Sequence, residues 1–167
     1  MVRVAKQEDL KEILELYLYL HEKSVPEFSE HLMTTWNQII QDENHHVIIN
    51  EVDGKIISSC VCVIIPNLTR NVRPYALIEN VVTHPEYRGR GYAEAVLNKL
   101  LSYKNVDCVV GETLRQSRGF WHKMIKKYNG TRRNVTYYDN TTSSFVIPNN
   151  SITNDEMYEM FDKWDKA

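Results

Sequence analysis

The stretch Arg88-Gly89-Arg90-Gly91-Tyr92-Ala93 is the part of this chain that best indicates its fold. An apolar run from Tyr75 to Thr83 precedes it across a His84-Pro85 turn, and apolar residues at helical spacing follow it from Ala93 to Leu101. The first N–H groups of a helix have no partner inside the helix, and the helix dipole favours negative charge at this N-terminus. Glycines let a guest approach the backbone, and two arginines add positive charge. The stretch therefore predicts an anion site suited to a pyrophosphate.

Two other phosphate loops fit this stretch poorly. No Lys-Ser or Lys-Thr pair follows a spaced glycine, as a Walker A loop requires. Only two glycines lie in the turn, and no alternating series of strands and helices precedes it, which argues against a dinucleotide fingerprint. On spacing alone, a helix that happens to begin with glycines and arginines is a third interpretation.

Length and composition indicate one ordinary soluble domain spanning residues 1–167, because 43% of the residues are hydrophobic and 25% are charged. The net charge of −2 gives no global reason to bind nucleic acid or an anionic membrane. No apolar run approaches the roughly 20 residues of a membrane-spanning helix, and the start of the chain does not resemble a signal peptide. The three cysteines, an odd number, suggest reduced thiols, so we expect a cytoplasmic protein.

The pattern of apolar residues predicts a mixed α/β (α+β) domain. A hairpin turn is expected at Asp53-Gly54, a helix N-cap at Ser29 and a capping box at 153–156. The apolar stripe of the last helix needs a cover, which either its own domain or the second subunit of a homodimer would provide. The expected strands are 2–5, 46–52, 55–65, 75–83, 106–111, 134–138 and 143–147, and the expected helices are 7–22, 29–40, 90–103, 115–128 and 153–167.

With its flanks, the run from Val81 to Ala93 closely resembles the acetyl-CoA-binding motif of the GNAT acetyltransferase superfamily. That motif is Arg or Gln, two residues, Gly, one residue, then Gly or Ala, and Arg88, Gly91 and Ala93 fill its defined positions. The order of elements from Val2 to about Ile147 matches as well. The resemblance implies the GNAT fold, a central mixed, mostly antiparallel sheet of about seven strands with helices on both faces. Helix 153–167 would be an addition to it.

The resemblance also implies acetyl-CoA as the acyl donor. The backbone N–H groups of the turn would hold its pyrophosphate, and main-chain groups of Val81 and Val82, with Thr83 at the strand end, would pair with the pantetheine arm. A splay between strands 75–83 and 106–111 would admit that arm. The residues expected around the pyrophosphate are Arg88, Gly89, Arg90, Gly91, Tyr92 and Ala93. No metal is expected, because His45-His46 has no third ligand nearby.

A finer similarity, to glucosamine-phosphate acetyltransferases, suggests a small-molecule amine as acceptor. It rests on residues 65–70, 73–75 and 78–82, and it indicates substrate contacts from Arg70, Arg73, Tyr75 and Asn80. The two arginines could clamp an anionic group of the substrate, or they could simply lie in a solvated loop.

Transfer to an amine needs a group that takes the proton of the amine. Glu79 is the first candidate, directly or through water, although it could instead face solvent or pair with Arg70 or Arg73. Glu112 is the second candidate. His84 is a weaker one, because shaping the turn before Pro85 is an alternative role for it.

The leaving thiolate also needs a group that protonates it. Many relatives carry Phe-Tyr where this chain has Phe120-Trp121, and an indole N–H is a donor but no practical acid. Trp121 then packs or forms a wall of the CoA site, and Tyr128 or solvent supplies the proton. No cysteine has a cationic neighbour in the sequence, which favours direct attack in a ternary complex. The alternatives are an acyl-CoA-binding sensor and a protein or peptide N-acetyltransferase.

Overall fold

The computed structural model describes residues 1–20, 22–68, 71–103, 106–113, 117–134 and 143–149. The chain divides into two compact units. The first comprises Met1–Ile64 and Ile78–Tyr103, and the second comprises Ile65–Leu77 and Lys104–Ala167. The expected helix at 153–167, most of the expected strand at 134–138 and the candidate residue Arg70 lie outside the described residues.

The first unit contains strands in the order β1-β2-β3-β4. Strand β1 (Val2–Val4) is antiparallel to β2 (His45–Val52), and β2 is antiparallel to β3 (Lys55–Ile65). The two residues that connect β2 to β3 have φ values of 50° at Asp53 and 76° at Gly54. A two-residue hairpin turn of the type that Asp-Gly favours requires positive φ at both positions, so the hairpin prediction is confirmed.

Two helices follow β1. A short 3-10 turn, η1 (Gln7–Asp9), leads into α1 (Leu10–Tyr17), and Ser29 caps α2 (Glu30–Gln41) by accepting a 3.2 Å hydrogen bond from the N–H of Leu32. The first helix is thus shorter than the expected 7–22. After Tyr17 the N–H groups of Leu18, Tyr19 and Leu20 bond to oxygens three residues earlier, so the α-helix ends in a tighter turn of the 3-10 type.

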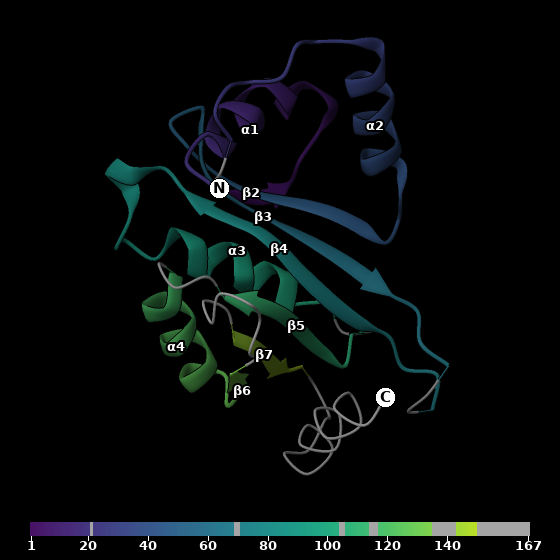
Figure 1. Ribbon diagram of the computed structural model, residues 1–167, viewed down its shortest axis with the longest axis vertical. Helices are drawn as coiled ribbons and strands as arrows, with labels where there is room; N and C mark the ends of the chain where they lie inside the picture. Colours follow the sequence, from purple (N-terminus) through teal and green to yellow (C-terminus); the bar gives the residue numbers. More distant parts are fainter. Residues whose placement is uncertain (21, 69–70, 104–105, 114–116, 135–142, 150–167) are drawn as a thin grey trace. The chain divides into compact units, whose positions relative to one another are not determined.

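Alternating residues of β2 face opposite sides of the first unit. Val47 and Ile49 pack with α1 and α2, through residues that include Leu16 and Trp36. Ile48, which has the opposite orientation, is also fully buried, and α3 (Tyr92–Leu101) approaches β1 and β2. Figure 1 shows α1 and α2 on one side of these strands and α3 on the other. This arrangement confirms helices on both faces.

Strand β4 (Tyr75–Thr83) contributes to both units. Its first three residues belong to the second unit, where β4 is parallel to β5 (Cys108–Thr113) with Ala76 opposite Val109 and Leu77 opposite Val110. From Ile78 onward it belongs to the first unit and leads directly into the glycine turn.

The second unit has strand order β4-β5-β7-β6, with β7 (Ser143–Pro148) antiparallel to both β5 and β6 (Thr131–Asn134). Helix α4 (Arg118–Lys127) buries Trp121, Met124 and Ile125. The strand expected at 134–138 therefore begins earlier, at Thr131, directly after the turn at Asn129-Gly130. The described residues form seven strands in all, and the mixed, mostly antiparallel α+β class is confirmed.

Candidate functional site

The glycine turn has a backbone that only glycine adopts readily. Gly89 has φ 75° and Gly91 has φ 85°, both in the left-handed region. Gly91 is the N-cap residue of α3, and no side chain caps this helix. A Cβ atom built on either glycine would have nothing within 4 Å. The space beside both glycines is therefore open, which leaves the main chain at the start of α3 accessible to an anion.

Hydrogen bonds close the turn on itself. After β4, a 3-10 turn, η2 (Pro85–Tyr87), forms with the N–H of Tyr87 donating to the oxygen of His84 at 2.9 Å. Arg88 Nε donates to the main-chain oxygen of Thr83 at 3.0 Å. The guanidinium of Arg90 lies 5.6 Å from the ring centroid of Tyr87, over its face. Both arginines are exposed, so two positive charges flank the open space.

The middle of β4 departs from regular strand geometry at Asn80, which has φ 49°. Asparagine accepts the left-handed conformation more easily than most residues, and irregular strand positions of this kind occur beside active sites. Glu79 and Asn80 are both exposed, whereas Val82 is buried. The sequence pattern predicts a regular strand here; the polar pair inside an otherwise apolar run is the one feature that could have indicated the irregularity.

Ser58 of β3 bonds to the last two residues of β4, and no pattern in the sequence indicated this contact. Its side chain is fully buried, and its Oγ donates to the oxygen of Val82 at 2.8 Å. Since a serine has one hydroxyl proton, the 2.8 Å contact between Ser58 Oγ and Thr83 Oγ1 is a bond in which the threonine donates. The Val82 carbonyl, one of the expected contacts for pantetheine, therefore already faces β3.

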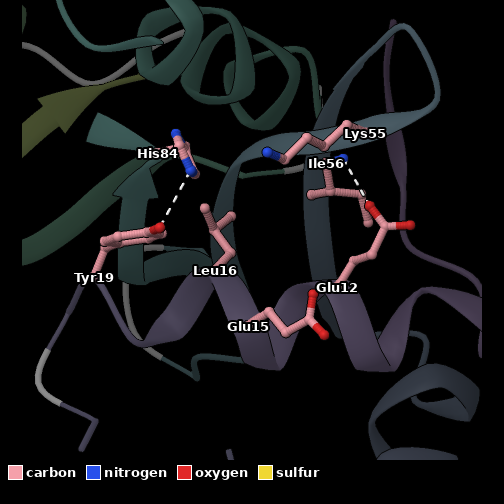
Figure 2. Close-up of a pocket in the computed structure, with 7 residues that line it drawn as sticks. All are labelled: Glu12, Glu15, Leu16, Tyr19, Lys55, Ile56 and His84. Atoms are coloured by element: carbon pink, nitrogen blue, oxygen red, sulfur yellow. Dashed lines mark hydrogen bonds between the residues drawn. The ribbon is translucent and has the colours of Figure 1, made fainter. Parts of the chain in front are cut away.

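A pocket of about 130 Å³ lies in the first unit beside the end of β4 (Figure 2). The Tyr19 hydroxyl is 3.2 Å from His84 Nε2, and Glu12 Oε2 accepts a 2.9 Å bond from the N–H of Ile56. Nothing in the sequence linked Tyr19 to His84, which is 65 residues later. The pocket is lined by Glu12, Glu15, Leu16, Tyr19, Lys55, Ile56 and His84.

The remaining acceptor-side candidates lie in the second unit. Arg73 Nε is 3.0 Å from Asp107 Oδ2, so this arginine has a partner within its own unit. Tyr75 packs against a small core formed by Cys108, Val110 and Val146. Glu112 is exposed on β5.

Trp121 is a packing residue of the second unit. It is 5% exposed, and its ring stacks on Phe145 with centroids 4.3 Å apart and planes at 29°. Phe120 meets Trp121 edge-on at 5.0 Å. Tyr128 follows the helix as its C-cap, with Lys127 Nζ 5.5 Å from its ring centroid.

The described residues contain no group of three His, Cys, Asp or Glu side chains that could hold a metal ion. None of the described helices has the length and apolar character needed to cross a membrane. Burial raises the pKa of the thiols of Cys60 and Cys62, the latter to about 12, so neither is an activated nucleophile.

Comparisons with known proteins agree with this geometry. The model of the acetyltransferase (GNAT) family matches residues 8–124. A solved structure from Agrobacterium tumefaciens strain C58, assigned as an acetyltransferase, is 27% identical over 82% of this chain and 96% of that one, with a TM-score of 0.69. An acetyltransferase of Trypanosoma brucei is 26% identical over 74% of this chain and 89% of that one, with a TM-score of 0.64.

Glucosamine-6-phosphate N-acetyltransferase of Arabidopsis thaliana shares the fold, with a TM-score of 0.67 and 21% identity over 83% of this chain and 98% of that one. A search of curated protein sequences gives no match. The family match covers well over half of the chain and includes β4, the glycine turn and α3. The chain therefore belongs to the GNAT family of acetyltransferases, whose members use acetyl-CoA.

Proposed function

We propose that this protein moves the acetyl group of acetyl-CoA to the amine of a small molecule by direct attack in a ternary complex. The observation that carries the proposal is the pair of left-handed glycines, Gly89 and Gly91, with open space above both. The main-chain N–H groups at the start of α3 would hold the pyrophosphate there, since the helix has no side-chain cap. Arg90 and Arg88 would add charge-assisted contacts.

The pantetheine arm would pair with the main chain of β4 in the manner of an added strand. Neighbouring residues of a strand direct their N–H and C=O groups to opposite edges. Because the Val82 carbonyl is bonded to Ser58, the neighbouring Val81 is the better candidate for the outward edge. The irregularity at Asn80 would free a backbone N–H near Val81 to meet the negative charge that develops on the thioester oxygen.

In the proposed reaction the amine nitrogen attacks the thioester carbonyl carbon, a C–N bond forms and the C–S bond breaks. Glu79 takes the proton of the amine through water, with Glu112 as the second candidate. The thiolate leaves with a proton from Tyr128 or from solvent, because the packed indole of Trp121 offers no acid. Arg73, held by Asp107, and Asn80 are our proposed acceptor contacts, as are Tyr75 and Arg70.

Direct attack is our choice of route because burial raises the pKa of the Cys60 and Cys62 thiols, so neither is an activated nucleophile for an acyl-enzyme. The choice of a small amine as acceptor has a separate basis. The chain shares its fold with glucosamine-6-phosphate N-acetyltransferase, and it repeats the polar pattern around β4 that suggested the same branch.

The test is binding of CoA by calorimetry to two matched variants, Gly91→Ala and Gly54→Ala. Gly54 in the β2-β3 hairpin has φ 76° and equally open surroundings, so both substitutions strain the backbone by about 1 to 2 kcal/mol. We expect CoA affinity to fall at least tenfold in Gly91→Ala only. Equal affinities in the two variants would refute the pyrophosphate assignment.

Thiol release from acetyl-CoA in the presence of a panel of small amines and short peptides then tests the acceptor. Release with small amines supports the proposed transfer, and release only with peptides supports a peptide acetyltransferase. Tight CoA binding with no release from any acceptor supports the sensor alternative.

A further inference from the structure

Four aromatic rings of the first unit form a continuous series, which we call the aromatic ladder: Tyr19, His84, Tyr87 and Tyr92. Each ring meets the next edge-on. The centroids of Tyr19 and His84 are 4.9 Å apart, those of His84 and Tyr87 are 5.6 Å apart, and those of Tyr87 and Tyr92 are 6.0 Å apart. Edge-to-face packing is a favoured geometry for aromatic pairs, so these contacts hold each ring against the next.

The aromatic ladder spans the glycine turn from one end to the other. His84 directly follows β4, Tyr87 lies in η2, and Tyr92 is the first residue of α3. Gly89 and Gly91 lie between Tyr87 and Tyr92 in the sequence. Glycine loses more backbone freedom on ordering than any other residue, so a turn built on two of them needs fixed points on both sides. The rings supply these points without entering the space above the glycines.

Tyr19 anchors the ladder from outside the turn. It follows the end of α1, and Figure 2 shows its hydroxyl directed at the imidazole of His84. The backbone of His84 is fixed by a 2.9 Å bond from its N–H to Ile57 O and by the bond that its oxygen accepts from Tyr87. The imidazole Nδ1 is buried and has no partner in the described part of the chain. Besides its two ring contacts, the imidazole is therefore oriented by the bond between Nε2 and the Tyr19 hydroxyl.

We propose that Tyr19 is a positioning residue for the acyl donor. Acting through His84 and Tyr87, it holds the glycine turn in the conformation that receives the pyrophosphate. This inference rests on the proposed function, because it takes the turn to be the pyrophosphate site. It adds a contribution to donor affinity from a side chain that lies outside the turn and outside β4.

The test compares two ligands, CoA and pantetheine, on Tyr19→Phe. Pantetheine has the arm of CoA but no pyrophosphate. A residue that orders the turn therefore affects the binding of CoA and leaves the binding of pantetheine unchanged. Calorimetry for CoA and ligand-detected NMR for pantetheine give the two dissociation constants. We expect CoA binding to weaken about threefold to tenfold, the range of one net hydrogen bond, with pantetheine binding unchanged. An unchanged CoA constant, or equal weakening of both ligands, would overturn the inference.

A double-mutant cycle separates action through His84 from direct contact between Tyr19 and the donor. If Tyr19 acts through His84, Tyr19→Phe has no further effect on CoA binding once His84→Ala is present. Additive losses would show that Tyr19 works by another route. The Gly91→Ala variant in the same assay keeps the two proposals apart. If Gly91→Ala weakens CoA binding and Tyr19→Phe does not, the pyrophosphate site stands and only the role of Tyr19 falls.

The first unit provides a matched control in its other His–Tyr pair. His46 and Tyr103 stack with centroids 4.8 Å apart, and Tyr103 lies beyond the C-terminal end of α3. The ten residues of α3 place that end about 15 Å from Tyr92. We expect Tyr103→Leu to lower the unfolding temperature while leaving the preference for CoA over pantetheine intact. A loss of CoA affinity alone in Tyr103→Leu would mean that general loosening of the unit explains the Tyr19 result.

Discussion

Arg88 Nε donates to the main-chain oxygen of Thr83 across 3.0 Å, so the first arginine of the glycine turn is tied to the last residue of β4. One nitrogen of the guanidinium is thereby used within the protein, and the terminal nitrogens extend from an exposed side chain. The same side chain can thus close the turn and face an anion. Arginine has enough donors for both tasks, whereas lysine has a single ammonium group.

The first prediction concerns this double role. Arg88→Lys keeps the charge but cannot make both contacts in the same geometry, so we expect CoA affinity to fall about threefold to tenfold. Arg88→Ala loses both contacts, so we expect a larger fall in CoA affinity for this variant. Calorimetry at two salt concentrations measures the effect, because removal of a charge that faces the pyrophosphate also weakens the salt dependence of binding. If Arg88→Lys binds CoA like the wild type, the bond to Thr83 has no part in donor binding.

Much of the fold was predictable because its signals are local. The hairpin at Asp53-Gly54, the cap at Ser29 and the glycines of the turn each encode their own backbone geometry in one or two residues. The unbroken runs of buried residues in β2 and β3 are similarly typical of strands covered on both faces. Boundaries were less accurate, as at α1, because the change from α-helical to 3-10 hydrogen bonds after Tyr17 leaves the apolar spacing almost unchanged.

The contacts that organise the site were not predictable in the same way. Ser58 reaches Val82 from another strand, and Tyr19 reaches His84 from another helix. A serine in a strand or a tyrosine after a helix has no local feature that reveals such a partner. Arg73 likewise has a partner that its sequence context did not reveal, since its Nε lies 3.0 Å from Asp107 Oδ2.

The second prediction concerns acid stability. Asp9 is buried and forms a bidentate ion pair with Arg3, at 2.6 and 3.0 Å, which with a 2.6 Å bond from the N–H of Lys6 lowers the pKa of Asp9 below 3.8. A lowered folded-state pKa gives stability that is present above pH 3.8 and is lost as the pH falls through the folded value.

Asp9→Asn should therefore lower the free energy of unfolding at pH 7 by about 2 to 3 kcal/mol, and the deficit should shrink toward pH 2. Urea unfolding followed by circular dichroism at several pH values measures this. Glu15→Gln is the control, because its pair with Lys11 is exposed and 4.0 Å long. A deficit independent of pH would contradict the assignment to Asp9 ionisation.

The third prediction concerns Gly130. Asn129 takes φ 54° at the end of α4, and the N–H of Gly130 donates to Ile125 O at 2.7 Å, as in a helix that ends in a left-handed residue. A Cβ on Gly130 would lie 2.6 Å from the main-chain oxygen of Val146. Gly130→Ala should cost about 2 to 3 kcal/mol of stability, whereas Asn129→Gly should be close to neutral. Chemical denaturation measures both, and equal stabilities would exclude the predicted clash.

The fourth prediction concerns Trp121. Its ring stacks on Phe145 in the core of the second unit, so Trp121→Ala should cost about 3 to 5 kcal/mol of stability and Trp121→Phe clearly less. If packing is its role, folded Trp121→Phe turns over like the wild type once an acceptor is found. Thermal unfolding and steady-state kinetics on the same samples measure this. A stable Trp121→Phe with low turnover and normal CoA affinity would instead show that the indole N–H takes part in the reaction.

The last prediction concerns the proposed base. Glu79 is exposed on β4 beside the irregular Asn80. Glu79→Gln keeps the size of the side chain and removes the proton acceptor, so we expect kcat to fall about 100-fold or more with an unchanged dissociation constant for CoA. Glu112→Gln is measured in parallel, and the variant with the larger loss of kcat identifies the base. Raising the pH should reduce the difference in kcat between Glu79→Gln and the wild type, because a growing fraction of the amine is then already neutral. Full activity in Glu79→Gln at neutral pH would remove Glu79 from the mechanism.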